Sequence, residues 1–282
     1  AMSTDILARI QAQLHTFSKG QKRIANYILE SYDKAAFMTA SKLGKTVAVS
    51  ESTVVRFAVE LGFDGYPSMQ RSLQEMVRTR LTSVQRIEAA NDRFGDQDVV
   101  SSVLQSDIDS IRLTAESLDR REMAACVEAI LQAKHIYIVG VRSSAALAAY
   151  LNFYFRNLFD NVRLVSSTAT SEMFEQLLRV GKEDVVIGIS LPRYSSRTVK
   201  LLQYAHDSGA TVVTITDKPE APGGKVADLV LCAKSNMVSF VDSLVAPMSV
   251  INALIVSVGL QQEDSVAKTY EDLERLWDEY DA

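Results

Sequence analysis

Apolar positions in the first part of the chain recur at the spacing of helices. From Asp5 to about Val77 they repeat every three or four residues, no convincing strand pattern occurs, and Gly62 and Gly65 punctuate the end of this stretch. Because a helix turns once in about 3.6 residues, this spacing places the apolar side chains on one face. The pattern predicts an all-α domain at residues 1–78.

Beyond residue 104 the pattern changes to short β-branched apolar runs that alternate with longer helical stretches. The runs are HIYIVG, NVRLV, DVVIGIS, TVVTIT and ADLVLCA. Strands this uniformly apolar are covered on both faces, which is typical of a parallel sheet between two layers of helices. We therefore expect an α/β doubly wound domain at residues 105–282. Residues 79–104 are polar and without a sustained apolar face, so we interpret them as a linker.

The composition agrees with a globular protein. The 282 residues are 47% hydrophobic and 23% charged, which is enough to bury one or two ordinary cores. The most apolar run, residues 243–260, approaches the length of a membrane span, but Pro247 and Asn252 within it favour a buried helix. The start of the chain lacks the pattern of a signal peptide. We expect a cytoplasmic protein that does not contact membranes.

The charge is distributed unevenly between the two expected domains. Residues 1–80 contain 11 Lys and Arg against 7 Asp and Glu, or +4, which leaves 19 against 28, or −9, for the remainder. A basic small domain joined to an acidic larger one fits contact with nucleic acid at the N-terminal end.

The stretch VSESTVVRFAVELGF, residues 49–63, predicts a helix with one polar and one apolar face. The hydroxyl of Ser50 is placed to cap its first turn, and the short helix ASKLGKTV precedes it through a tight turn. Together they predict a helix-turn-helix whose second helix enters a major groove. The alternative is an ordinary helical hairpin with a solvated face. The expected DNA-binding residues are Lys45, Ser50, Ser52, Thr53 and Arg56.

Two predicted strands end in loops that carry hydroxyl groups and arginines and then open a helix. These loops are residues 141–144 and 190–198. In a doubly wound sheet ligands bind at the carboxyl ends of the strands, where helix N-termini favour a phosphate and arginine can grip it through two hydrogen bonds. The expected ligand-binding residues are Arg142, Ser143, Ser144, Ser190, Arg193, Ser195, Ser196 and Thr198. In the alternative interpretation the serines only cap helices, and the arginines, including Arg197, are solvated.

The residues needed for enzymatic chemistry do not gather at these loops. An isomerase needs a base beside the substrate carbonyl, but the three histidines, at positions 15, 135 and 206, fall elsewhere. Glu172 is the one loop-adjacent carboxylate of interest. No metal-ligand cluster, Ser/His/Asp arrangement or phosphate-binding glycine loop of the Walker type occurs, so we expect no metal and no cofactor.

The line LGKTVAVSESTVVRFAVELGFDGYPSMQRSL resembles the N-terminal domain of the RpiR family of bacterial transcriptional regulators. The shared pattern is approximately L-A-x-x-x-x-V-S-x-x-T-V-x-R-F-x-x-x-L-G-[FY]-x-G-[FY]. Gly44 stands where the family usually has alanine. The resemblance implies that Ser52, Thr53 and Arg56 face DNA.

The second half resembles the SIS, or sugar isomerase, domain, which binds phosphosugars and accompanies this type of helix-turn-helix. The family loops read G-x-G-x-S and S-x-S-G-x-T-x-x-T. The first loop here keeps Gly140 and Ser144 but has Arg142 in place of the middle glycine. The second keeps Ser190 and Thr198, has Ser195 for the first threonine, and reads Pro-Arg at 192–193 where the pattern has Ser-Gly.

These observations favour a DNA-binding transcriptional regulator that is not an enzyme. Its expected partners are a double-stranded DNA operator, a phosphorylated sugar or sugar-derived effector, and further copies of itself in a homodimer or homotetramer, because one helix-turn-helix reads only a few base pairs. The competing hypothesis is a sugar-phosphate isomerase or hydrolase that uses the same pocket. A ligand-binding protein without a DNA role would leave the Arg56 face unexplained.

Overall fold

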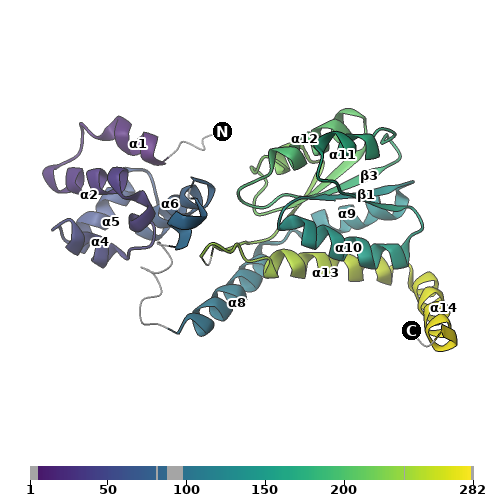
Figure 1. The fold of residues 1–282 in the computed structure, drawn as a ribbon. Coiled ribbons are helices and arrows are strands. Elements are labelled where there is room, and N and C mark those ends of the chain that lie inside the picture. The colour runs from purple at the N-terminus through teal and green to yellow at the C-terminus, as the bar shows by residue number, and fades with distance from the viewer. Residues whose placement is uncertain (1–5, 81, 88–97, 238, 281–282) are drawn as a thin grey trace. The chain divides into compact units, whose positions relative to one another are not determined.

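The computed structural model describes residues 6–80, 82–87, 98–237 and 239–280. The chain divides into two compact units (Figure 1). The first comprises the described residues up to Ser102 together with part of the segment Met237–Val241, and the second comprises the rest. The first unit is helical and the second is built on a parallel sheet. This confirms the predicted fold class of an all-α domain joined to a doubly wound α/β domain.

Helices α1 to α6 pack together in the first unit. They are α1 (Ile6–Gln13), α2 (Lys19–Glu30), α3 (Tyr32–Ala35), α4 (Ala40–Thr46), α5 (Glu51–Glu60) and α6 (Tyr66–Arg80). The apolar faces of these helices meet in one core in which Ile24, Phe57 and Leu73 are fully buried. The hydroxyl of Tyr66 donates to the carbonyl oxygen of Met38 at 2.6 Å, and burial raises the pKa of Tyr66 to about 12.

Helices α4 and α5 form the expected helix-turn-helix. The hydroxyl of Ser50 accepts a hydrogen bond from the backbone N–H of Thr53, so it caps α5 as predicted. Between the two helices the chain turns at Ala48, whose φ is 55°. The close approach of the turn to α4 requires a small residue at Gly44, because a Cβ there would lie 2.9 Å from the carbonyl oxygen of Val49. The alanine usual at this position in the family pattern therefore does not fit here unless the turn shifts.

The second unit contains five parallel strands in the order β2-β1-β3-β4-β5. They are β1 (Ile136–Gly140), β2 (Val162–Val165), β3 (Val185–Ile189), β4 (Thr211–Thr216) and β5 (Leu229–Cys232). From β1 the chain adds β2 on one side and β3 on the other, so the strand order reverses between β1 and β3. Ligands of doubly wound sheets bind at such a reversal, outside the carboxyl ends of the strands.

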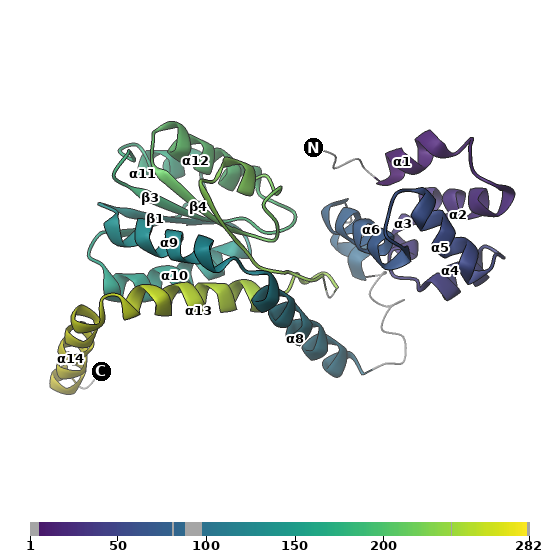
Figure 2. The same cartoon turned by 180° about the vertical axis from the view of Figure 1, so that it is seen from behind.

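Helices cover both faces of this sheet (Figures 1 and 2). On one side lie α9 (Arg120–Gln132), α10 (Ser144–Leu158) and α13 (Val245–Leu260), which pack on side chains such as Ile136 and Ile138 of β1. On the other side α11 (Thr170–Gln176) and α12 (Ser196–Asp207) pack on the alternate side chains, such as Tyr137 and Val139. A short 3-10 turn, Gly224–Val226, precedes β5.

The remaining helices are α8 (Val99–Ser117) and the C-terminal α14 (Glu263–Tyr280). Helix α8 begins inside the predicted linker, and residues 81 and 88–97 of that linker lie outside the described residues. The boundaries 1–78, 79–104 and 105–282 therefore stay a prediction.

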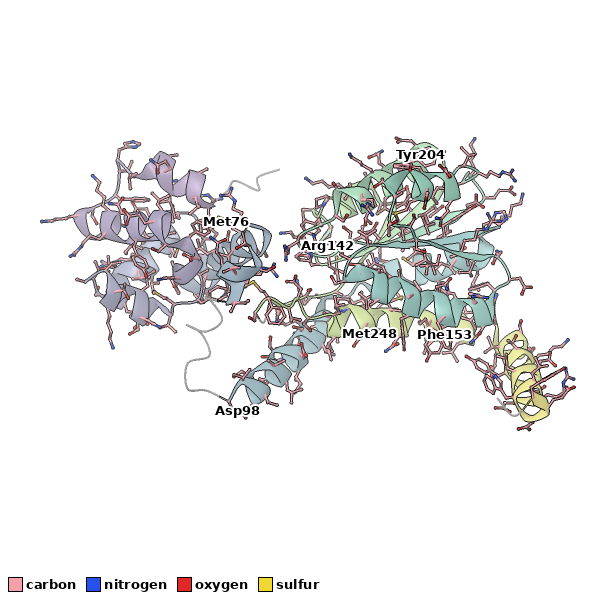
Figure 3. The ribbon with its side chains drawn as sticks, in the orientation of Figure 1. Met76, Asp98, Arg142, Phe153, Tyr204 and Met248 are labelled. Carbon is pink, nitrogen blue, oxygen red and sulfur yellow. The ribbon has the colours of Figure 1, made fainter. Side chains whose placement is uncertain are left out.

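Among the described residues no single helix is long and apolar enough to cross a bilayer. Helices α13 and α14 pass on length and composition only as a pair, and they are bent by 100° at their junction. Both α10 and α13 have solvent-exposed apolar side chains. Phe153 of α10 is 62% exposed (Figure 3), and Val256 of α13 is 58% exposed.

Candidate functional site

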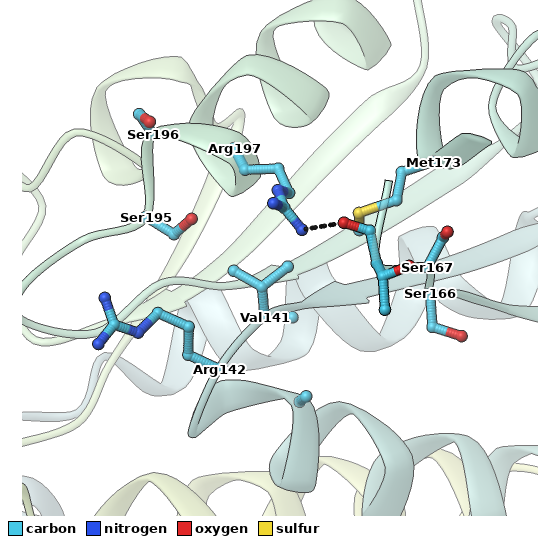
Figure 4. Close-up of a pocket in the computed structure, with 11 residues that line it drawn as sticks. Val141, Arg142, Ser166, Ser167, Met173, Ser195, Ser196 and Arg197 are labelled. Atoms are coloured by element: carbon cyan, nitrogen blue, oxygen red, sulfur yellow. Dashed lines mark hydrogen bonds between the residues drawn. The ribbon is translucent and has the colours of Figure 1, made fainter. Parts of the chain in front are cut away.

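A hollow of about 550 Å³ lies at the carboxyl ends of β1, β2 and β3. Three loops line it, namely residues 140–142 after β1, residues 166–168 after β2 and residues 195–197 at the start of α12. Ala145 and Met173 complete the lining (Figure 4). The hollow therefore occupies the strand-order reversal, where the sequence predicted the ligand, and its size is that of a small-molecule site.

The first loop turns sharply to bring Arg142 to this hollow. A Cβ on Gly140 would lie 2.6 Å from the carbonyl oxygen of Ser144, so only glycine allows the strand to approach α10 this closely. Arg142 then adopts a left-handed backbone with φ of 56°. Its side chain extends below Ser195 in Figure 4.

The serine hydroxyls at the two helix starts do not cap their helices. Ser143 precedes α10 and Ser195 precedes α12, and neither side chain makes a capping hydrogen bond. The alternative in which Ser195 only caps α12 therefore has no hydrogen bond in its favour. Ser195 and Ser196 line the hollow, where the first backbone amides of α12 add to the donors and favour an anion.

Arg197 places a second positive charge in the hollow. Its side chain extends from α12 toward the loop after β2, where Nη1 donates to the carbonyl oxygen of Thr168 at 3.3 Å (Figure 4). In that loop the hydroxyl of Ser167 donates to Oε2 of Glu172, which places this carboxylate beside the hollow without making it part of the lining. The described lining thus carries two guanidinium groups and no carboxylate.

Several predicted ligand-binding residues lie outside this lining. Ser190 and Thr198 are buried, at 2% and 0% exposure, and their hydroxyls have no hydrogen-bond partner among the described residues. Ser144 is also buried, Ser143 is exposed, and Arg193 is half-buried with φ of 70°. The structure therefore brings three of the expected residues together in the hollow, namely Arg142, Ser195 and Ser196, and roles for the other five stay predictions.

The sequence interpretation missed the loop after β2 and Arg197. Ser166, Ser167 and Thr168 directly follow the apolar run NVRLV, so the signal used for the other two loops, a strand that ends in hydroxyls, was present here as well. Arg197 was not among the expected ligand-binding residues. Its position in the first turn of α12, beside two serines that line the hollow, was the signal for its inclusion.

Side chains that could act as a general acid or base are scarce at this edge of the sheet. The described lining contains no His, Asp, Glu, Lys or Cys. His135 lies just before β1, at the opposite end of the strands, where Nδ1 is 2.8 Å from Oδ1 of the buried Asp184. Within the described part of the chain no group of three His, Cys, Asp or Glu side chains is arranged to hold a metal ion.

A second hollow, of about 480 Å³, lies in the helical unit beside the helix-turn-helix. Three of the expected DNA-binding residues, Ser50, Thr53 and Arg56, line it together with Ser18, Gly20, Gln21, Arg23, Val49 and Glu60. Ser18 caps α2 and Ser50 caps α5, so the N-termini of both helices border the same space. The expected DNA-binding residues did not include any at the start of α2.

The polar face of α5 is exposed as expected. Val54, Phe57 and Ala58 are fully buried on the opposite face. The guanidinium of Arg56 donates to Oγ1 of Thr53 at 3.4 Å, and the hydroxyls of Ser50 and Ser52 are 2.9 Å apart. Lys45 lies in the last turn of α4, outside the hollow. The face offers short hydroxyl donors and the guanidinium of Arg56, a set that suits base edges and phosphates, and Glu60 adds one carboxylate at its C-terminal end.

Two family models match the chain. The helix-turn-helix domain of the rpiR family matches residues 4–79, and the SIS domain matches residues 129–257. The first model contains the whole helix-turn-helix, and the second contains all three loops of the larger hollow.

Known proteins resemble the chain over most of its length. The HTH-type transcriptional regulator HexR of Pseudomonas aeruginosa is 25% identical over 92% of this chain and 90% of HexR. The sugar isomerase domain of an RpiR transcription factor from Sphaerobacter thermophilus superposes with a TM-score of 0.61 and 26% identity, over 64% of this chain and 99% of that domain. Vibrio vulnificus NanR, complexed with ManNAc-6P, superposes with a TM-score of 0.59 and 23% identity, over 96% and 98% of the two chains.

Proposed function

This chain belongs to the RpiR family of transcriptional regulators, and we propose that a phosphorylated sugar or sugar-derived metabolite, bound in the larger hollow, controls its affinity for DNA. The observation that carries the proposal is the lining of that hollow. The lining contains two guanidinium groups, the free backbone amides at the start of α12, and serine hydroxyls, of which that of Ser195 makes no capping hydrogen bond. The described lining contains no carboxylate. Such a set matches the charge and the oxygen atoms of a phosphate.

The DNA contact is proposed for the exposed face of α5. Lys45, Ser50, Ser52, Thr53 and Arg56 are the residues for base and phosphate contacts. Arg23 and the N-terminus of α2 border the same hollow as Arg56 and extend the positive surface toward a neighbouring DNA phosphate. A double-stranded operator is the partner that this arrangement fits.

The effector class is supported by two independent features. The solved structure of NanR holds ManNAc-6P, and this chain shares its fold over nearly the full length. The hollow here has the volume of a small-molecule site, with hydroxyl groups from two of its three loops and Arg142 from the third, which suit the oxygens of a sugar phosphate.

We propose a sensor and not an isomerase, because proton transfer at a sugar carbonyl needs a base at the reacting carbon. Glu172 is a candidate beside the hollow, but it is not part of the described lining and it accepts a hydrogen bond from Ser167. An isomerase or hydrolase remains the competing class, and its signature is turnover of the ligand.

The test uses the full chain and a DNA fragment from the promoter of its own gene. Gel retardation is measured with and without each member of a panel of sugar phosphates, and the recovered ligand is analysed by mass spectrometry and NMR. We expect one phosphorylated compound to change the retardation and to return unchanged. Conversion of that compound at an enzymatic rate would instead support the competing hypothesis of an isomerase or hydrolase.

A further inference from the structure

The loop between β3 and α12 is tied near its middle to the end of β4. The hydroxyl of Tyr194 in this loop donates to Oδ1 of Asp217 at 2.8 Å, and Asp217 directly follows β4. The hydroxyl of Thr216, the fully buried last residue of β4, donates to the same oxygen at 3.4 Å. One carboxylate oxygen therefore accepts hydrogen bonds both from the loop and from the sheet.

The start of the same loop is fixed to the sheet and to the core. The backbone N–H of Ser190 donates to a carbonyl oxygen of β4 at 3.0 Å, and residues 191–192 are buried. Arg193 follows with φ of 70°, a conformation that an L residue keeps only where neighbouring contacts determine it. The Tyr194–Asp217 hydrogen bond is such a contact, because it holds the residue directly after Arg193.

The end of the loop lines the larger hollow. Ser195 directly follows Tyr194, and it borders the hollow together with Ser196 and Arg197 (Figure 4). Neither Tyr194 nor Asp217 belongs to the described lining. Groups that bind a ligand must be held in place by the residues around them, and a displaced helix start would carry its amides and hydroxyls away from a bound phosphate.

We propose that the Tyr194–Asp217 hydrogen bond positions the loop after β3, and with it the start of α12, for a phosphate in the larger hollow. Both are positioning residues that do not touch the ligand. The proposal deepens the proposed function and rests on it, since it concerns the same hollow. The negative charge of Asp217 by itself disfavours an anion nearby, so its charge and its hydrogen bond act on phosphate affinity in opposite directions.

That opposition allows the two roles to be separated by comparing Asp217→Asn with Asp217→Ala in the full chain. Both variants lack the negative charge, but the side-chain oxygen of asparagine still accepts from Tyr194, whereas alanine has no acceptor. Isothermal titration with inorganic phosphate measures the affinity. Asp217→Ala should bind phosphate about 2-fold to 10-fold more weakly than Asp217→Asn, as the loss of one hydrogen bond implies. Equal affinities of the two variants would overturn the proposal.

Tyr194→Phe tests the donor of the same hydrogen bond without changing the charge. It should bind inorganic phosphate about 2-fold to 10-fold more weakly than the wild type. In the Asp217→Ala background it should have no further effect, because the two side chains share one hydrogen bond. Tyr204→Phe is the matched control, since Tyr204 is also half-buried and its ring packs against Phe174 of α11 at 5.6 Å. An unchanged affinity of Tyr194→Phe, or an equal loss in Tyr204→Phe, would contradict the positioning role.

Hydrogen exchange of residues 190–198, measured by mass spectrometry without phosphate, tests the position of the loop independently of any ligand. Tyr194→Phe and Asp217→Ala should speed exchange in this segment, and Asp217→Asn should not. Faster exchange without loss of phosphate affinity, or loss of affinity without faster exchange, would reject the positioning role alone. A wild type that binds no inorganic phosphate would reject the phosphate site of the proposed function, and this proposal with it.

Discussion

Two arginines in the loops after β1 and β3, Arg142 and Arg193, hold left-handed backbone conformations, with φ of 56° and 70°. An L side chain costs about 1–2 kcal/mol in this region, where glycine is unstrained. The two residues differ in position, because Arg142 lines the hollow and Arg193 does not. Backbone strain is often retained at binding sites, where the strained residue contributes to ligand binding. The strain at Arg142 therefore has a functional explanation if its side chain binds the effector.

This contrast gives a matched pair of variants. Arg142→Gly and Arg193→Gly should both leave the fold as stable or stabilise it by up to about 1 kcal/mol, since backbone strain is removed. Arg142→Gly should weaken binding of the effector by about 10-fold or more, and by more than Arg193→Gly, because a charged hydrogen bond is worth about 1.5–3 kcal/mol. Thermal unfolding and calorimetry measure the two effects. An equal loss of effector affinity in both variants would contradict the role assigned to the hollow.

A second residue-scale prediction concerns the DNA face. Arg56→Ala should weaken specific DNA binding by about 1–3 kcal/mol if the guanidinium reads a base edge, without unfolding, because Arg56 is exposed. Arg71→Ala, which removes the same charge from the exposed side of α6, is the control and should have a smaller effect. Fluorescence anisotropy with the promoter fragment measures both. Equal affinities of Arg56→Ala and wild type would reject α5 as the reading helix.

At the scale of elements, periodicity was sufficient to predict the helix-turn-helix of the first domain and the strands of the second, but it did not single out α6. Segments such as DVVIGIS have one stable arrangement, since strands apolar on both faces need cover on both. The lining of the hollow was harder to predict. Ser190 and Thr198 turn inward while Ser195 and Arg197 line the hollow, and this depends on backbone angles such as that of Arg193, which sequence spacing does not reveal.

The tight contact between α4 and its turn gives an element-scale prediction. Gly44→Ala should lower the melting temperature, because overpacking against the Val49 carbonyl costs about 1–3 kcal/mol and the gain in helix propensity is about 1 kcal/mol. Gly20→Ala is the control. Its Cβ would meet only side chains, at 3.5 Å or more, so the melting temperature should stay the same or rise. A rise for Gly44→Ala would show that the turn relaxes freely.

At the scale of the whole molecule, the exposed apolar residues of α10 and α13 predict self-association. Phe153 and Val256 are 62% and 58% exposed, and α13 is apolar around its circumference. We expect a symmetric dimer or tetramer in sedimentation at micromolar concentration. Phe153→Glu should weaken the assembly, whereas Leu178→Glu, at a site that is 70% exposed outside both helices, should not. A monomeric wild type would contradict the prediction.

The proposed coupling between effector binding and DNA binding is a difference in binding free energy and does not require the two sites to be close. An effector changes DNA affinity only if it binds two arrangements of the assembly with different affinity, and DNA must then change effector affinity by the same factor. The larger hollow and the helix-turn-helix belong to different units, so the coupling is read from binding equilibria measured with both ligands present.

The most direct test of the central claim is calorimetric titration of the full chain with the active sugar phosphate and with the same sugar lacking its phosphate, each with and without the promoter fragment. The account predicts that the phosphorylated sugar binds at least about 100-fold more tightly, as the loss of two charged hydrogen bonds implies. It also predicts that DNA shifts the affinity for the phosphorylated sugar and that the compound is recovered unchanged. Equal affinity for both sugars, or an affinity that DNA leaves unaltered, would contradict a phosphate-sensing regulator.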